Sequence, residues 1–266
     1  MDEYSCSNRK LWDEWVPLHA ASAFYHLDAF KAGANVLNDL ELGEVGPVAG
    51  KSLLHLQCHF GMDTLSWARL GAHVTGVDYS EEAIALANQL ASEVNLPGRF
   101  ICSDIYALDD ALQEQFDIVY TSYGVLSWLP DIPRWAKLAA NHVKPGGIFY
   151  IAEFHPFAMV LDDEAGEYRL CTPYFEKNVM EFKVQGSYAN RRGEVKTPVE
   201  YGWNHTLGEI VSSLIDAGLA LEFLHEHPFT VYEQLSFLKP DGKGLWRPPE
   251  EPAMLPLMFS LRAKKA

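Results

Sequence analysis

The stretch SLLHLQCHFGMDTLSWARLGAHVTGVD, residues 52–78, contains two short apolar runs separated by a segment with helical spacing. We expect residues 52–57 and 73–77 to form buried strands, because short runs rich in aliphatic and β-branched side chains favour strands. The stretch after Gly61 predicts a helix that ends at Gly71. A strand, a helix and a second strand in this order are typical of a βαβ unit around a parallel sheet.

The same alternation continues on the C-terminal side. A helix is expected after Ser80, which is well placed as its N-cap, with Glu81 and Glu82 in the first turn where the helix dipole favours carboxylates. Residues 131–143 predict a helix closed by Pro145-Gly146-Gly147, and the pattern returns at Thr206-Leu207-Gly208-Glu209, a capping box that opens a helix ending at Gly218. Five further strands are expected, at residues 99–102, 116–121, 148–152, 221–224 and 257–261.

The regular pattern is interrupted once. Residues 155–203 carry scattered aromatic, charged and glycine residues without a helical period. We therefore predict a helical lid at residues 1–49, a sheet domain made of residues 50–154 and 204–266, and an inserted, strand-rich cap at residues 155–203.

Composition narrows the possible partners. The 266 residues include 21 Lys and Arg against 36 Asp and Glu, a formal net charge of −15, which argues against nucleic-acid binding. No apolar run approaches the roughly 20 residues that span a bilayer, and the start MDEYSCSNRK is not a signal peptide. The four cysteines lack CxxC spacing and the density of a disulfide scaffold, so we expect a reducing, cytoplasmic compartment.

The loop after the first strand is the expected ligand site, because ligands of open α/β sheets bind at the carboxyl ends of strands. Asp78 ends the second strand, 21 positions after Gln57, where a carboxylate can accept hydrogen bonds from both ribose hydroxyls. The phosphate-binding patterns G-x-G-x-x-G and G-x-x-x-x-G-K-[ST] are absent. The sequence therefore favours a nucleoside ligand without phosphates.

Five segments in order resemble the motifs of class I S-adenosylmethionine-dependent methyltransferases: residues 53–65, 74–80, 102–105, 116–124 and 143–149. Within that class the chain is similar to the small-molecule branch that includes the quinone-biosynthesis methyltransferases. The resemblance implies a Rossmann-like, doubly wound sheet of seven strands, mostly parallel with an antiparallel last strand. It also implies S-adenosyl-L-methionine as cofactor and a small-molecule substrate, with methyl transfer by in-line displacement.

Carried over by position, the resemblance places the methionine part of the cofactor at the loop around His59 and Gly61, its ribose on Asp78, and its adenine near Asp104 and Ile105. The full set of expected cofactor contacts is Tyr25, Gln57, Cys58, His59, Gly61, Asp78, Tyr79, Ser80, Asp104, Ile105 and Thr121. One departure stands out. The family pattern E/D-x-G-x-G-x-G becomes Gln57-Cys58-His59-Phe60-Gly61-Met62-Asp63, which keeps one of the three glycines. Residues other than glycine adopt a positive φ only at a cost in conformational free energy.

Catalytic candidates lie where the chain leaves the fourth and fifth strands. They are Tyr123, Trp128, Glu153 and His155. His155 is the expected general base, because imidazole can remove a proton at neutral pH, and Tyr123 is the second expected catalytic residue. Trp128, Tyr201 and Trp203 are the expected substrate contacts.

Other chemistry is disfavoured by what the motifs lack. The segment 121–124 does not contain the Asn/Asp-Pro-Pro-Tyr signature of nucleic-acid methylation. His55 and His59 are four apart, but no further ligand has suitable spacing, so no metal is expected.

Two other functions share these features. A non-catalytic S-adenosylmethionine-binding protein, either a sensor or a pseudoenzyme, fits the glycine-poor loop. An NAD-type Rossmann oxidoreductase shares Asp78 but lacks the phosphate loop. Asp78 could also serve only as a cap, and His155 only as a hydrogen-bonded strand end. The methylated atom and the oligomeric state are left open.

Overall fold

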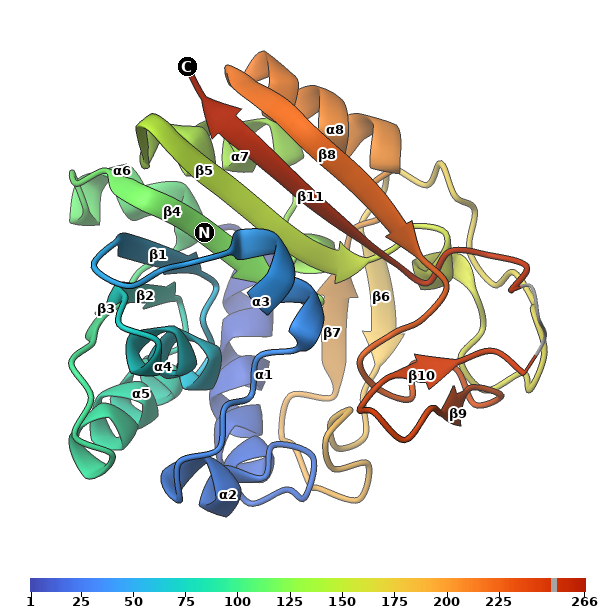
Figure 1. The fold of residues 1–266 in the computed structure, drawn as a ribbon. Coiled ribbons are helices and arrows are strands. Elements are labelled where there is room, and N and C mark those ends of the chain that lie inside the picture. Colours follow the sequence, from blue (N-terminus) through green and yellow to red (C-terminus); the bar gives the residue numbers. More distant parts are fainter. Residues whose placement is uncertain (250–252) are drawn as a thin grey trace.

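Seven strands form one sheet in the computed structural model, which describes residues 1–249 and 253–266 (Figure 1). Their order is β3-β2-β1-β4-β5-β11-β8. The bounds are β1 Ser52–Leu56, β2 His73–Asp78, β3 Arg99–Cys102, β4 Phe116–Ser122, β5 Val143–Phe154, β8 Leu219–His227 and β11 Met258–Lys265.

The last strand of the chain is antiparallel to its two neighbours in the sheet. β1 to β5 pair in parallel, whereas β11 is antiparallel to both β5 and β8. The predicted fold class is therefore confirmed: a Rossmann-like, mostly parallel sheet of seven strands with an antiparallel last strand. The order reverses at β1, so the carboxyl ends of β1, β2 and β4 meet at the switch point where such sheets bind ligands.

The helices follow the expected rhythm, and their starts are explained by side-chain caps. Ser80 Oγ accepts from the backbone N–H of Ala83 at 3.0 Å, and Thr206 Oγ1 accepts from that of Glu209 at 3.1 Å. The α-helices are α1 Glu3–Ala20, α2 Leu27–Lys31, α3 Asp39–Val45, α4 Met62–Arg69, α5 Glu81–Glu93, α6 Leu108–Ala111, α7 Ile132–Asn141 and α8 Leu207–Asp216. The short 3₁₀ helices are η1 Ile105–Ala107, η2 Leu126–Trp128 and η3 Ala158–Val160.

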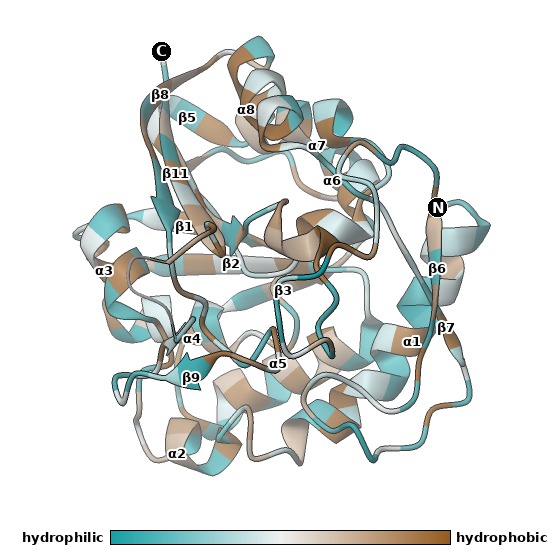
Figure 2. Cartoon of the chain, turned by 90° about the vertical axis from the view of Figure 1, so that its right-hand side faces the viewer, coloured by the Kyte–Doolittle hydropathy of each residue, from teal (hydrophilic) through white to brown (hydrophobic). Residues whose placement is uncertain are grey.

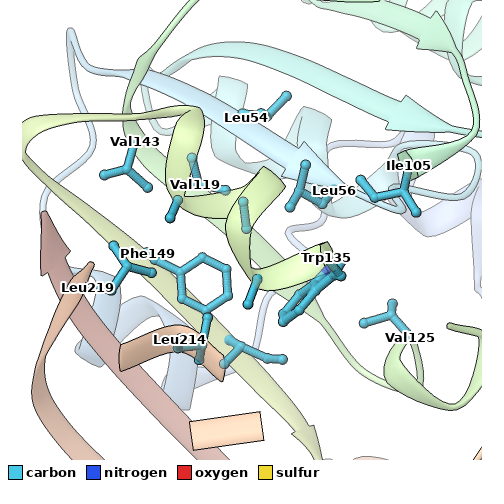
Figure 3. Close-up of a cluster of buried hydrophobic side chains, with 14 of the residues drawn as sticks. Leu54, Leu56, Ile105, Val119, Val125, Trp135, Val143, Phe149, Leu214 and Leu219 are labelled. Atoms are coloured by element: carbon cyan, nitrogen blue, oxygen red, sulfur yellow. The ribbon is translucent and has the colours of Figure 1, made fainter. Parts of the chain in front are cut away.

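Apolar side chains cover both faces of the sheet. Under α7 and α8, Trp135 packs edge-on against Phe149 of β5, with ring centroids 5.7 Å apart (Figure 3). On the opposite face Leu53 and Trp67 belong to a second core cluster, with Tyr120 of β4. Burial on both faces explains why the central strands read as nearly continuous apolar runs.

One local expectation was wrong. Pro145-Gly146-Gly147 was expected to close a helix ending near residue 143, but α7 ends at Asn141 and these three residues lie within β5. Their strand is irregular: the β4–β5 register shifts between Phe116 and Ile118, and Gly146 has a φ of 77°. A positive φ within a strand that pairs irregularly is typical of a bulge. In the sequence, such a bulge has the same Pro-Gly-Gly pattern as a turn after a helix.

The segment 155–203 forms one short antiparallel pair, β6 Met180–Lys183 with β7 Val199–Gly202, among turns and irregular segments. A separate two-stranded pair, β9 Lys239–Pro240 with β10 Trp246–Arg247, lies in the later loop. Helix α1 runs beside β6 and β7 in both views (Figures 1 and 2). In the described part of the chain, none of the helices combines the length and apolarity needed to cross a membrane.

Side-chain hydrogen bonds fasten α1 to the inserted segment. Asn8 Oδ1 accepts from the backbone N–H of Tyr201 at 2.9 Å, and Asn8 Nδ2 donates to the carbonyl of the same residue at 2.7 Å. Trp15 Nε1 donates to the Gly186 carbonyl at 2.8 Å. The N-terminal helix and the insertion therefore form one covering layer.

Candidate functional site

The loop between β1 and α4 takes left-handed backbone conformations without the usual glycines. Gln57 has a φ of 57° and His59 a φ of 50°, while Gly61 has a φ of 76°. His59 stands at the first glycine position of the family pattern, so the chain accepts there a conformation that costs other residues about 1 kcal/mol or more. The loop therefore takes positive φ values at Gln57, His59 and Gly61, and at the second of these it carries an imidazole.

Gly61 is the position in this loop where a side chain does not fit. A Cβ at Gly61 would lie 2.6 Å from Cε1 of Phe100 and 3.2 Å from Cβ of Ala87. Gly50 has a nearly identical φ of 75°, in a turn closed by a 2.9 Å hydrogen bond from the Lys51 N–H to the Val48 carbonyl, and open space around the same position.

Gly61→Ala should therefore lower the free energy of unfolding by about 2–4 kcal/mol, because the strained φ and the overlap with Phe100 add. Gly50→Ala, which carries the φ strain alone, should cost about 1 kcal/mol. Urea denaturation of both variants measures the difference. Equal losses would mean that Phe100 moves aside without cost.

Asp78 faces this loop from the end of β2. Its Oδ2 accepts from the backbone N–H of His59 at 2.8 Å, and its Oδ1 accepts from that of Ser80 at 2.9 Å. Burial raises the pKa of Asp78 to about 6 despite these hydrogen bonds. Each carboxylate oxygen keeps a lone pair, so Asp78 can accept two further donors.

Aromatic rings from four separate segments cover the loop. We call them the aromatic cluster: Trp12, Trp15 and His19 of α1, Tyr25 of the following turn, His59, Trp128 of η2 and Tyr188 of the insertion. The ring centroid of Trp12 lies 5.1 Å from that of His59 and 5.3 Å from that of Trp128. The Tyr25 and Tyr188 hydroxyls share a short hydrogen bond. The cluster therefore shields the loop from water.

The other expected cofactor contacts lie near Asp78, but several are engaged elsewhere. Ser80 Oγ donates to Asp13 Oδ1 of α1 at 2.6 Å. Asp104 caps η1 by accepting from the Tyr106 N–H at 3.0 Å, and Ile105 belongs to the core under α7. Thr121 Oγ1 donates to the Leu56 carbonyl at 3.2 Å, between two strands.

The remaining three belong to the loop and its edge. Gln57 Nε2 donates to the Val125 carbonyl at 3.3 Å, whereas its Oε1 is buried and, among the described residues, has no hydrogen-bond partner. The Tyr79 hydroxyl is likewise buried without a partner in the described chain. Cys58 is buried, and burial raises the pKa of its thiol, so it stays protonated at neutral pH.

His155 and Tyr123, the expected catalytic pair, are each held by other side chains. His155 Nε2 lies 3.0 Å from Glu226 Oε1, and its Nδ1 accepts from the Phe157 N–H at 3.1 Å. The Tyr123 hydroxyl donates to Glu41 through a short bond. Neither ring nitrogen of His155 is left for a substrate in this arrangement, so its role as general base stays a prediction.

The three expected substrate contacts lie on neighbouring segments, since the Trp203 N–H donates to the Ser127 carbonyl at 2.9 Å, but their side chains have different partners. Trp128 belongs to the aromatic cluster. Tyr201 instead packs on Tyr4 of α1, with ring centroids 4.9 Å apart, and Trp203 lies 6.4 Å from the same ring. Tyr201 and Trp203 therefore fasten the start of α1, whereas Trp128 faces the loop.

Two buried carboxylates shape this edge of the sheet: Glu153, one of the catalytic candidates, and Glu41, which the sequence pattern does not single out. Glu153 of β5 accepts from the backbone N–H groups of residues 124–126 and so shapes the turn that leads to Trp128. Glu41 of α3 is fully buried and accepts from the hydroxyls of Tyr120, at 3.2 Å, and Tyr123. Burial raises the pKa of Glu41 to about 8 and that of neighbouring Asp63 to about 6. Both carboxylates depend on tertiary neighbours that no local pattern reveals.

Glu41 should make the stability of the protein depend on pH. Its pKa is about 8 in the folded chain against an ordinary 4.5, so the folded state holds an extra proton between these values and stability falls as pH rises through them. Glu41→Gln should therefore raise the unfolding free energy by about 5 kcal/mol at pH 9 and leave it unchanged near pH 4. Chemical denaturation at both pH values, with exposed Glu114→Gln as control, measures this. Equal gains at both pH values would refute the assignment.

The described residues contain no cluster of three or more His, Cys, Asp or Glu side chains that could hold a metal ion.

Comparisons with known proteins place these features in a family. Residues 54–151 match the methyltransferase domain profile. The chain is 30% identical over 185 residues to a ubiquinone biosynthesis O-methyltransferase of Pseudomonas fluorescens, an alignment that covers 68% of this chain and 72% of the relative. It is 37% identical over 103 residues to the enzyme of the same name from Coxiella burnetii, covering 39% and 43%.

Solved structures share the fold. An S-adenosylmethionine dependent methyltransferase from Mesorhizobium loti superposes with a TM-score of 0.59 at 20% identity, covering 88% of this chain and all of that one. A second, from Clostridium acetobutylicum, has a TM-score of 0.58 at 15% identity and covers 98% and 99%. The comparisons favour neither the oxidoreductase nor the non-catalytic alternative.

Proposed function

Since the chain belongs to the class I S-adenosylmethionine-dependent methyltransferases, we propose that it methylates a hydroxyl group of a small, planar molecule. One observation carries most weight: Asp78 binds the backbone of the loop between β1 and α4, keeps a lone pair free on each oxygen, and lies beside a loop covered by aromatic rings. The names of the curated relatives support an oxygen acceptor. The net charge of −15 argues against a nucleic-acid substrate.

The residues at this edge fit S-adenosylmethionine. In the described chain, Gln57 Oε1, the Tyr79 hydroxyl, His59 Nδ1 and His19 Nε2 are buried polar atoms without partners, which is costly unless a ligand pairs with them. Asp78 would hold the ribose hydroxyls, and the loop around His59 and Gly61 would hold the methionine part. When bound, the cofactor supplies a methyl group on a cationic sulfur.

The chain contributes positioning and exclusion of water. An in-line displacement depends on holding the acceptor oxygen close to the methyl carbon, which needs rigid walls rather than covalent help. Trp12 and Trp128 meet edge to face, with ring centroids 5.3 Å apart, so they close the site against water, and aromatic rings favour positive charge nearby. Glu153 fixes the turn that carries Trp128. In this proposal the acceptor would bind beside α1, η2 and the loop.

Calorimetry and labelled methyl transfer together test this function. We expect S-adenosylmethionine and S-adenosylhomocysteine to bind, and NAD not to bind. Methyl-labelled S-adenosylmethionine is then incubated with catechol, aniline and thiophenol, which share a ring and differ in the nucleophilic atom. Label on catechol alone supports the proposal.

Two outcomes would contradict it. Binding of NAD with none of the adenosyl ligands would point to the oxidoreductase alternative. Binding of S-adenosylhomocysteine without transfer to any of the three acceptors would favour a non-catalytic binding protein over the proposed enzyme.

A further inference from the structure

His19 and His59 form a hydrogen-bonded pair of imidazoles at the centre of the aromatic cluster. Nδ1 of His19 lies 2.9 Å from Nε2 of His59. The two outer nitrogens, Nε2 of His19 and Nδ1 of His59, are buried and have no hydrogen-bond partner in the described part of the chain. The buried His155, in contrast, has both ring nitrogens engaged.

The pair has one acceptor end and one donor end. Because a neutral imidazole carries one N–H, the hydrogen between the rings belongs to either His19 or His59. In either case one outer nitrogen has a lone pair and the other carries a hydrogen. A proton taken up at one end can therefore pass through the shared hydrogen bond and leave at the other.

The surroundings keep both rings neutral. Burial lowers the pKa of His19 to about 3, and burial together with His19 lowers the pKa of His59 well below its usual value. The titratable groups that face the pair are the Tyr25 and Tyr188 hydroxyls, whose pKa values burial raises, and Asp78, which binds the His59 backbone N–H. Asp63 is the nearby carboxyl that acts on both tyrosines. Burial outweighs the nearby carboxyl groups, so the pair is a free base at neutral pH.

The backbone supports a functional reason for His59. The residue holds a φ of 50° at a position where the family pattern has glycine. Strain of this kind persists where the side chain is needed, and here it places the ring against Trp12, 5.1 Å away, and His19.

We propose that the His19–His59 pair accepts the proton that a hydroxyl acceptor loses during methyl transfer. This inference rests on the proposed function. The acceptor oxygen forms a bond to the methyl carbon while its O–H bond breaks, and the electrons of the methyl carbon–sulfur bond remain on sulfur. The O–H proton bonds to the free outer nitrogen, and the site keeps one positive charge as the sulfonium becomes a thioether and the pair becomes protonated.

Nuclear magnetic resonance of ¹⁵N-histidine-labelled protein with S-adenosylhomocysteine bound tests the pair without turnover. We expect scalar coupling between the facing nitrogens of His19 and His59, and neutral rings from pH 6 to 8. Absence of the coupling, or an imidazolium signal from either residue in this range, overturns the proposal.

Kinetics with catechol test the proton transfer. His19→Asn and His59→Gln each keep an amide N–H that can occupy the shared hydrogen bond, but neither can relay a proton. We expect each to lower the rate at pH 7 by about 100-fold or more, as loss of a general base does. The wild-type rate at saturating donor should be flat between pH 6.5 and 8.5, whereas the variant rates should rise about tenfold per pH unit, because catechol must then ionise unaided.

A matched control separates this role from packing. His142 is a buried histidine distant from the loop, and its Nδ1 lies 2.9 Å from the Glu114 carbonyl oxygen. His142→Asn should keep the wild-type rate and pH profile. An unchanged rate and pH profile in His19→Asn would overturn the proposal, even if the wild type binds S-adenosylhomocysteine and methylates catechol. If the wild type does not bind S-adenosylhomocysteine, the proposed function itself is contradicted.

Discussion

Asp78→Ala should weaken the binding of S-adenosylhomocysteine by about 100-fold or more. Asp78 is a partly buried carboxylate with a free lone pair on each oxygen, and hydrogen bonds to a charged acceptor contribute about 1.5–3 kcal/mol each. Two ribose hydroxyls would depend on it. Isothermal titration calorimetry measures the affinity directly.

Three further measurements separate ligand contact from loop damage. Asp78→Asn preserves the shape of the side chain and should lose about tenfold, whereas Asp117→Asn, at the opposite end of the sheet, should bind as the wild type does. Because the pKa of Asp78 is about 6, wild-type affinity should fall as pH drops through 6, and that dependence should vanish in Asp78→Asn. Unchanged affinity in Asp78→Ala would place the cofactor elsewhere.

Glu153→Ala should produce a large loss of stability. The carboxylate accepts from the N–H groups of Gly124, Val125 and Leu126, the last two at 2.8 and 3.1 Å, and also from its neighbour Phe154 at 2.7 Å. Removing it leaves buried donors unpaired, at about 1–3 kcal/mol each. We expect a loss of about 4 kcal/mol, which corresponds to roughly 10 °C in melting temperature for a chain of this size.

Differential scanning calorimetry measures this loss, and Glu114→Ala provides the control. Glu114 is exposed and pairs with Arg99 at the surface at 2.7 Å, so its removal should change stability by less than about 1 kcal/mol. A loss in Glu153→Ala no larger than that of the control would show that the turn finds other acceptors.

The sheet was predictable because its strands and helices are encoded by local patterns. The apolar runs around Leu54 and Val74 predict one strand each, and Ser80 predicts the start of a helix, all from residues adjacent in the sequence. The structure confirms these three elements. The prediction that Gly146 closes a helix was wrong, because a glycine with positive φ occurs both in a strand bulge, as here in β5, and after the end of a helix.

The site was predictable only in part. Its place at the ends of β1 and β2 follows from topology, but the individual contacts of the cofactor and substrate stay predictions. The pairing of His19 with His59, and of Tyr25 with Tyr188, joins residues that only the folded chain brings together. Burial, which sets the pKa values of Glu41 and His19, is also a property of the assembled fold.

The fastening of α1 to the insertion has a consequence for synthesis on the ribosome. Asn8 meets Tyr201 across 193 positions, and Trp15 meets Gly186 across 171. The helix that covers the loop is thus translated first, but it gains these partners only after about three quarters of the chain has been made. Nascent chains halted before residue 186 should therefore leave Trp15 and Asn8 without these hydrogen-bond partners, and chaperones that bind incompletely packed segments would meet α1 during that interval.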